Sequence, residues 1–147
     1  MTCAGCGTGD GPLVPSPACA QHALTVAERE FSDQAYFAVH RITVAAYVLQ
    51  HPDASSDHAV AVHLAALPAE ADGLGPDAGR RRLRWAAEHL RAHPPGRLAR
   101  PARRGTRTIA DVVAARTAEE HCATVTRWAG QVWTAWHAIA QDTLPAG

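Results

Sequence analysis

The sequence has no lysine, and none of its apolar runs is long enough to cross a lipid bilayer. A membrane-spanning helix needs roughly 20 consecutive apolar residues. The longest apolar stretch here, residues 42–49, is far shorter. The N-terminus also lacks the basic region and apolar region of a secretory signal peptide. We therefore expect a cytoplasmic protein that has no membrane partner.

The sequence also lacks the period-two alternation of apolar and polar residues that marks a half-buried strand, and it shows no internal repeat. Apolar residues instead recur at helical spacing, which predicts helices over residues 18–31, 34–50, 57–67, 80–92, 109–115 and 118–142. A chain of 147 residues can bury a sizeable core as one domain. We predict an all-α fold with a single domain over residues 1–147. A short metal-binding arm (1–22) would pack on a compact bundle of four to five helices (23–147).

Helix boundaries are indicated by capping residues and prolines. Asp33 offers an N-cap for the helix over 34–50, and Pro52 ends it. Pro68 is expected to kink or end the helix over 57–67, and residues 73–79 are expected to form a linker. Thr117 and Glu120 have the spacing of a capping box at the start of the last helix.

Three of the four cysteines lie within the first 19 residues, at metal-ligand spacing. Cys3, Cys6, Cys19 and His22 follow the pattern C-x2-C, a gap of twelve residues, then C-x2-H. Thiolate and imidazole are the ligands that Zn²⁺ prefers, and four of them complete a tetrahedral structural site. The pattern therefore predicts a zinc site. His51 is an alternative fourth ligand, because it lies at a helix end beside a turn. A redox role for Cys3 and Cys6 is disfavoured, since thioredoxin-like chemistry places the CxxC after a strand.

The formal net charge is zero, but the charges are segregated along the chain. Residues 1–78 carry nine acidic residues and two arginines, whereas residues 79–107 carry ten arginines and one glutamate. A GC-rich coding sequence would explain the use of arginine alone. An anion site is the alternative, since arginine grips phosphate or carboxylate with two donors. Nucleic acid is an unlikely partner at zero net charge. The segment 80–107 suits a protein partner or a small anionic ligand.

Polar side chains form a stripe on the helix expected over 34–50. At 100° per residue, Tyr36, His40, Tyr47 and His51 fall within an arc of roughly 60°. His63 and His121 lie on other predicted helices. Polar groups on a buried helix need partners, and these side chains can satisfy one another across the bundle. They can equally converge as a metal or acid–base site. The candidate catalytic residues under that second interpretation are His40, Tyr47, His63 and His121.

Several motifs extend over nearly the whole chain. They are Cys3-x-x-Cys6-Gly7, Pro17-x-Cys19, Tyr36-x-x-x-His40, Tyr47-x-x-x-His51-Pro52, Val60-x-x-His63-Leu64 and Val125-x-x-Trp128. Together they resemble a family of small bacterial proteins that is catalogued as a domain of unknown function. The resemblance implies no activity, substrate or partner. It does direct attention to the cysteines, tyrosines and histidines in these motifs.

Two functional hypotheses follow. The first is a zinc-binding helical protein in which the metal is mainly structural and the role is binding or regulatory. The alternative is a metal-dependent enzyme with a His/Tyr site in the bundle core, acting on a small anionic substrate.

Overall fold

The computed structural model describes Cys3, Cys6 and residues 12–71 and 76–144. Within these residues the regular structure consists of seven α-helices and one 3-10 turn, and there is no strand. The elements are α1 (Pro17–Ser32), α2 (Gln34–Phe37), α3 (His40–Gln50), η1 (Pro52–Ala54), α4 (Asp57–Ala71), α5 (Pro76–Ala92), α6 (Ile109–Ala114) and α7 (Ala118–Thr143). The predicted all-α class is confirmed.

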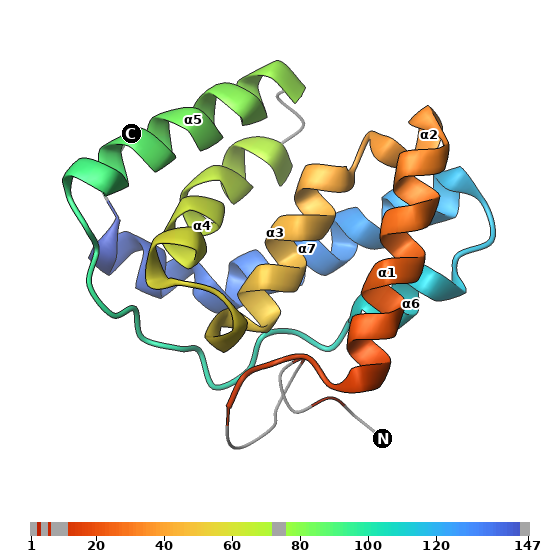
Figure 1. Cartoon of the computed structure of the whole chain (residues 1–147), viewed down its shortest axis with the longest axis horizontal. Helices are drawn as coiled ribbons and strands as arrows, with labels where there is room; N and C mark the ends of the chain where they lie inside the picture. Colours follow the sequence, from red (N-terminus) through yellow and green to blue (C-terminus); the bar gives the residue numbers. More distant parts are fainter. Residues whose placement is uncertain (1–2, 4–5, 7–11, 72–75, 145–147) are drawn as a thin grey trace.

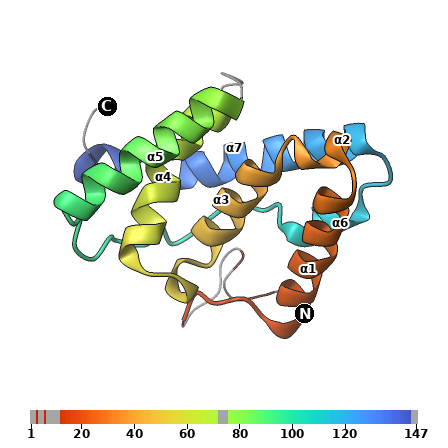
Figure 2. The ribbon, with the colours of Figure 1, turned by 45° about the horizontal axis from the view of Figure 1, so that its top comes forward.

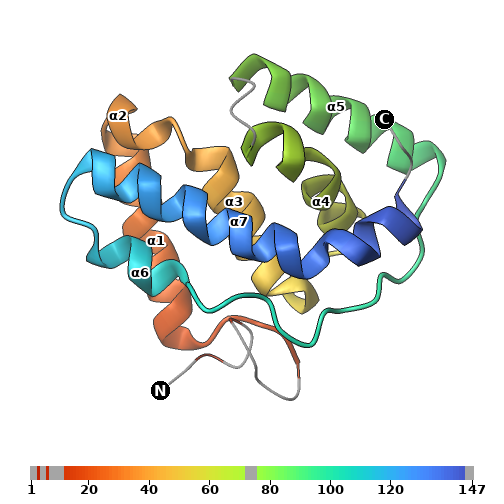
Figure 3. The same cartoon turned by 180° about the vertical axis from the view of Figure 1, so that it is seen from behind.

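The long helix α7 runs across one side of the molecule, and α3 packs on its inner face (Figures 1 and 3). At one end, α4 and α5 lie side by side, and α4 also contacts α3 and α7. At the other end, α1 packs against α2 and α6. Figure 2 shows α5 covering α4, with the start of α1 and the end of α3 on the opposite side of the molecule.

The core is built mainly from α3, α4 and α7. Trp128 and Trp136 on α7 are fully buried, as are Leu49 on α3 and Leu64 on α4. The indole N–H of Trp136 donates to the carbonyl oxygen of Leu49 over 2.9 Å, at the C-terminal end of α3. This bond satisfies one of the carbonyl groups that a helix leaves unpaired at its end, and it fixes where α3 stops against α7.

The helix predicted over residues 34–50 is interrupted, so that prediction was wrong in its extent. α2 ends at Phe37 and α3 begins at His40, with Val39 between them at φ −105° and ψ 8°. The Thr43 hydroxyl lies 3.1 Å from the Val39 carbonyl oxygen and 2.6 Å from a carboxylate oxygen of Glu30. A threonine bonded back to the carbonyl four residues earlier bends a helix. The break separates Tyr36, on α2, from the other members of the predicted polar stripe, which lie on α3 or at its end.

The remaining helices follow their local signals closely. Ser16 caps α1, since its hydroxyl accepts from the backbone N–H of Cys19. Thr108 and Asp111 form a reciprocal capping box at α6. At α7 only half of the predicted box forms: Thr117 accepts from the N–H of Glu120, but the Glu120 carboxylate accepts from the N–H of Arg116.

The two helices next to the predicted linker are longer than expected. α4 continues through Pro68 to Ala71, rather than ending near residue 67. α5 begins at Pro76, so residues 76–79 of the predicted linker are helical, while 73–75 lie outside the described residues. Proline is well suited to the first turn of a helix, because the N–H that it lacks has no partner there. Among the described residues, no helix has the length and hydropathy needed to span a membrane.

Candidate metal centre

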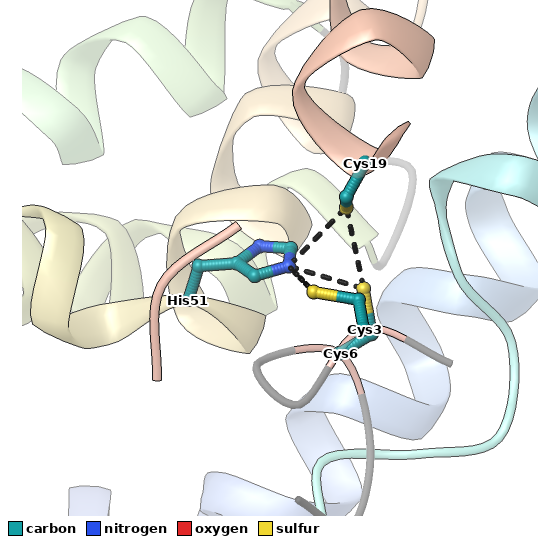
Figure 4. A group of neighbouring side chains, drawn as sticks. All are labelled: Cys3, Cys6, Cys19 and His51. Atoms are coloured by element: carbon teal, nitrogen blue, oxygen red, sulfur yellow. Dashed lines mark hydrogen bonds between the residues drawn. The ribbon is translucent and has the colours of Figure 1, made fainter. Parts of the chain in front are cut away.

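Three cysteines and one histidine meet where the N-terminal segment, the start of α1 and the end of α3 come together (Figure 4). The ligand atoms of Cys3, Cys6, Cys19 and His51 all lie within 4.8 Å of one another. The His51 Nε2 atom is 3.0 Å from the Cys6 sulfur, 3.4 Å from the Cys19 sulfur and 3.7 Å from the Cys3 sulfur. Cys6, Cys19 and His51 are buried, and Cys3 is half-buried. This group can hold a metal ion.

Local structure positions each of the four side chains. The backbone N–H of Cys6 donates to the Cys3 carbonyl oxygen over 3.1 Å, which closes the turn between these two ligands. Cys19 lies in the capped first turn of α1. His51 is the C-cap of α3, and its N–H donates to the carbonyl oxygens of Tyr47 and Val48. The end of one helix therefore faces the beginning of another across the cluster.

Hydrogen bonds around the group orient the ligand atoms. The His51 Nδ1 atom lies 2.8 Å from the Tyr47 carbonyl oxygen. A carbonyl can only accept, so Nδ1 carries the hydrogen and Nε2 is left to face the sulfurs. The backbone N–H of Ser16 donates to the Cys3 sulfur over 3.2 Å. Such outer contacts are typical of metal sites, where they fix the tautomer of a ligating histidine and stabilise thiolate charge.

The electrostatics of the cluster favour a cation. The hydrogen bond from Cys6 lowers the pKa of Cys19 to about 4, and His51 contributes in the same direction. That same bond, together with burial and the negative charge of Cys19, raises the pKa of the Cys6 thiol. Burial disfavours a charged His51, but its hydrogen bonds to Cys19 and to the Tyr47 carbonyl outweigh burial and raise its pKa. Without an added positive charge the sulfurs cannot all be thiolates, and a divalent cation removes this conflict.

Tyr47 lies beside this group rather than in a separate site. Its ring centroid is 4.5 Å from that of His51. Burial raises the pKa of the Tyr47 phenol, and the negative charge of Cys19 raises it further. Tyr47 therefore stays protonated, and its ring packs against the imidazole of His51.

A second polar cluster surrounds Glu30, which is fully buried on α1. We define the Glu30 cluster as Glu30, His40, Thr43 and His121. One carboxylate oxygen is 2.9 Å from the His40 Nδ1 atom. The other accepts from the Thr43 hydroxyl over 2.6 Å and lies 2.8 Å from the His121 Nε2 atom. The carboxylate thus receives hydrogen bonds from α3 and α7.

Arg29 determines the tautomer of His121. Its Nη1 atom is 3.4 Å from the His121 Nδ1 atom. Arginine has donors only, so Nδ1 accepts and Nε2 carries the hydrogen that is given to Glu30. The Arg29 guanidinium also donates to the carbonyl oxygens of Val112 and Val113 on α6. Four helices are tied together by these contacts: α1, α3, α6 and α7.

Comparison with protein-family models matches residues 1–137 to a family described as "Family of unknown function (DUF5946)". The chain belongs to this family. No curated protein and no solved structure matches the sequence.

The sequence-predicted site residues of this DUF5946 member fall into separate places. Cys3, Cys6 and Cys19 come together with His51, the alternative fourth ligand. His22, the other candidate, is half-buried on α1 and is not part of the group. His40 and His121 meet at Glu30, whereas His63 lies on α4 outside both groups, where burial lowers its pKa.

Sequence reasoning missed Glu30, although one signal was available. Cys19, Val26 and Glu30 are the buried residues of α1. They recur at spacings of seven and four, which place them on one face of the helix. A glutamate on the apolar face of a helix indicates a buried carboxylate that needs donors, and the nearby histidines supply them.

The two clusters differ in what they can do chemically. The cysteine group offers four ligand atoms to one point, which completes a tetrahedral set. In the Glu30 cluster both carboxylate oxygens already accept hydrogen bonds from side chains of the chain itself. Of that cluster only His40 is partly accessible, with 21% of its side chain exposed.

Proposed function

We propose that Cys3, Cys6, Cys19 and His51 bind one Zn²⁺ and that this metal is structural. The observation that carries the proposal is the convergence of four ligand atoms within 4.8 Å from segments up to 48 residues apart. Three thiolates and an imidazole favour zinc over Mg²⁺ or Ca²⁺, which prefer oxygen ligands. A ligand set of three cysteines and one histidine leaves no position for water, and closed coordination is typical of structural zinc.

The proposed role of the metal is to attach the N-terminal segment to the bundle. Among the described residues, Leu13 also attaches this segment: its N–H donates to the Asp53 carboxylate over 2.8 Å, and the N–H of Asp53 donates to the Leu13 carbonyl over 3.1 Å. Zinc binding in small zinc-finger peptides contributes about 10 kcal/mol or more to folding. A metal at this position would therefore dominate the free energy that holds the segment in place.

We infer that the metal-stabilised bundle serves as a cytoplasmic binding or regulatory module. A closed metal site supplies neither a bound water of lowered pKa nor an open position for a substrate. The chemistry of the cluster thus supports stabilisation of a recognition surface rather than turnover at the metal.

Elemental analysis of the protein purified without chelator tests the metal proposal. We expect one zinc per chain in the wild type and none in a Cys6→Ser variant. Cys122→Ser is the matched control, because Cys122 lies on α7 away from the cluster and should leave the zinc content unchanged. A Cys6→Ser protein that retains one zinc per chain and the wild-type melting temperature would contradict the proposal.

A second candidate function is an enzyme that uses the Glu30 cluster for acid–base chemistry on a small anionic substrate. The observation in its favour is that partly exposed His40 is bonded to a fully buried carboxylate. Histidine and glutamate are common general acids and bases. If His40→Ala leaves the melting temperature within about 1 °C of wild type, the residue is not needed for packing, and this result supports the enzyme hypothesis. A fall of several degrees supports the structural interpretation instead.

A further inference from the structure

An open hollow of about 570 Å³ lies between α7 and the loop that precedes α6. Three arginines line it: Arg103 and Arg107 from the loop, and Arg127 from α7. Polar side chains of α7 complete the wall, including Gln131 and Thr134. None of the residues of the cysteine group or of the Glu30 cluster lines the hollow, so it is separate from both.

The loop that carries two of these arginines is held firmly on both sides. On one side, the Gln131 side-chain oxygen accepts from the backbone N–H groups of Thr106 and Arg107, over 3.1 and 2.9 Å. On the other side, the Gln50 side-chain nitrogen donates to the carbonyl oxygens of Arg104 and Arg107, over 3.1 and 2.8 Å. A loop fixed in this way presents its side chains with little entropy left to lose on binding.

Gly105 allows the loop to approach α7 closely. Its φ is +102°, a conformation that other residues rarely adopt, and a Cβ there would lie 3.1 Å from the Cβ of Gln131. Buried Arg104 adds to the fixation, because its Nε atom donates to the Gln50 carbonyl oxygen over 3.1 Å. The position of the hollow is therefore set by specific backbone contacts.

Within the described part of the chain, the three guanidinium groups that line the hollow have no acidic partner. Among the described residues, none of Arg103, Arg107 and Arg127 forms an ion pair, and no acidic side chain lines the hollow. By contrast, Arg100 in the same loop is paired with Asp53 and Asp57. Three unneutralised positive charges around one concave surface create a local potential that attracts anions.

Gly130 supplies an independent observation. It lies near the middle of the 26-residue helix α7 and lines the hollow. Glycine is unfavourable inside a helix relative to alanine, and close packing does not require it here. A Cβ at this position would have no protein atom within 4 Å. The missing side chain leaves open space at this part of the hollow's lining.

We propose that this hollow binds the phosphate group of a small phosphomonoester. A phosphate monoester carries close to two negative charges at neutral pH and three acceptor oxygens. Three guanidinium groups neutralise this charge with about one positive charge to spare and equal the acceptor oxygens in number, and the Thr134 hydroxyl offers a further donor. A carboxylate, with one charge and two oxygens, would leave one arginine unpaired. The site goes beyond the proposed metal role and does not depend on it.

Isothermal titration calorimetry at low ionic strength tests the proposal, with inorganic phosphate, glucose 6-phosphate, acetate and duplex DNA as probes. We expect saturable binding of both phosphate compounds at one site per chain, and weaker binding of acetate. Tighter binding of glucose 6-phosphate than of phosphate indicates an ester as the ligand, and the reverse order indicates free phosphate. Absence of binding by both phosphate compounds would overturn the proposal, as would binding that is detected only with duplex DNA.

Variants locate the site. Arg127→Gln should weaken phosphate binding about tenfold or more, because one charge-assisted pair is lost. Arg84→Gln removes the same charge from the exposed face of α5, away from the hollow, and should leave the affinity unchanged. Equal losses in both variants would mean that net charge alone attracts the anion, and would refute a defined site.

Gly130→Ala separates binding from folding. The added methyl group should raise the melting temperature, because alanine favours the helix. It should also weaken phosphate binding, because it occupies the open space beside residue 130 in the lining of the hollow. A variant that is more stable yet binds phosphate as tightly as wild type would refute the role given to Gly130.

Discussion

Replacing Glu30 by alanine should destabilise the fold far more than replacing its neighbour Glu28. Both glutamates lie on α1, but Glu28 is exposed and Glu30 is fully buried. In Glu30→Ala, the His121 N–H loses its acceptor in a region that water does not reach, whereas the Thr43 hydroxyl can still donate to the Val39 carbonyl oxygen at 3.1 Å. Each buried donor left unpaired costs about 1–3 kcal/mol. His40 is partly exposed, so water can replace its bond.

One unpaired buried donor gives an expected loss of about 1–3 kcal/mol in the free energy of unfolding. For a chain of this length that corresponds to a fall in melting temperature of roughly 2–12 °C. Glu28→Ala should stay within about 0.5 kcal/mol of wild type, as is usual for an exposed site. Urea unfolding followed by circular dichroism measures both variants in the metal-loaded protein. If Glu30→Ala and Glu28→Ala unfold at the same urea concentration, the bonding assigned to the Glu30 cluster is wrong.

Three further predictions concern the metal, the loss of stability at low pH and the core. Removing the metal with a chelator should lower the melting temperature by more than 10 °C, because metal binding contributes about 10 kcal/mol or more in comparable sites. It should also expose Cys3, Cys6 and Cys19 to thiol reagents. Unchanged thiol reactivity after chelation would argue against a metal bound by these cysteines. The Leu13 N–H and then Arg100 hold the pKa of Asp53 below its ordinary value of about 3.8. Since the pKa of the folded state is the lower one, Asp53 stabilises the fold above about pH 4, and this contribution is lost as the pH falls further. Asp53→Asn should therefore flatten the acid-induced loss of stability below about pH 4, and a slope equal to that of wild type would count against the Leu13 contact. Trp136→Phe removes the bond to the Leu49 carbonyl and leaves a small cavity, so thermal unfolding should show a loss of about 1–3 kcal/mol; a loss below about 0.5 kcal/mol would show that this bond contributes little.

Helix positions could largely be predicted from local signals, because caps and prolines act within one turn of chain. Ser16 and Thr108 begin helices where their hydroxyls accept backbone N–H groups. The break between α2 and α3 could not be found in this way. It depends on Thr43 reaching Glu30 on another helix, and neither glycine nor proline marks the place. A contact between distant segments overrode local helix propensity there.

The choice between His22 and His51 also lay beyond local pattern. His22 has metal-ligand spacing from Cys19, but both lie on α1, where residues three apart point along the same face. Sequence spacing therefore allows His22 as a ligand, but it is not among the residues whose ligand atoms meet. His51 instead enters the group because α3 ends beside the first turn of α1, which is a consequence of how the helices pack. For the same reason the sequence indicated the histidines of the Glu30 cluster but not its carboxylate, because the partners of Glu30 lie on α3 and α7.

The most direct test of the central claim is the zinc content per chain of His51→Ala beside that of His22→Ala. The two variants remove the same imidazole from the two candidate positions, and both are measured by elemental analysis after purification without chelator. The account predicts one zinc per chain in His22→Ala, and loss or severe weakening of zinc binding in His51→Ala. Zinc retained at one per chain in His51→Ala and lost in His22→Ala would contradict it.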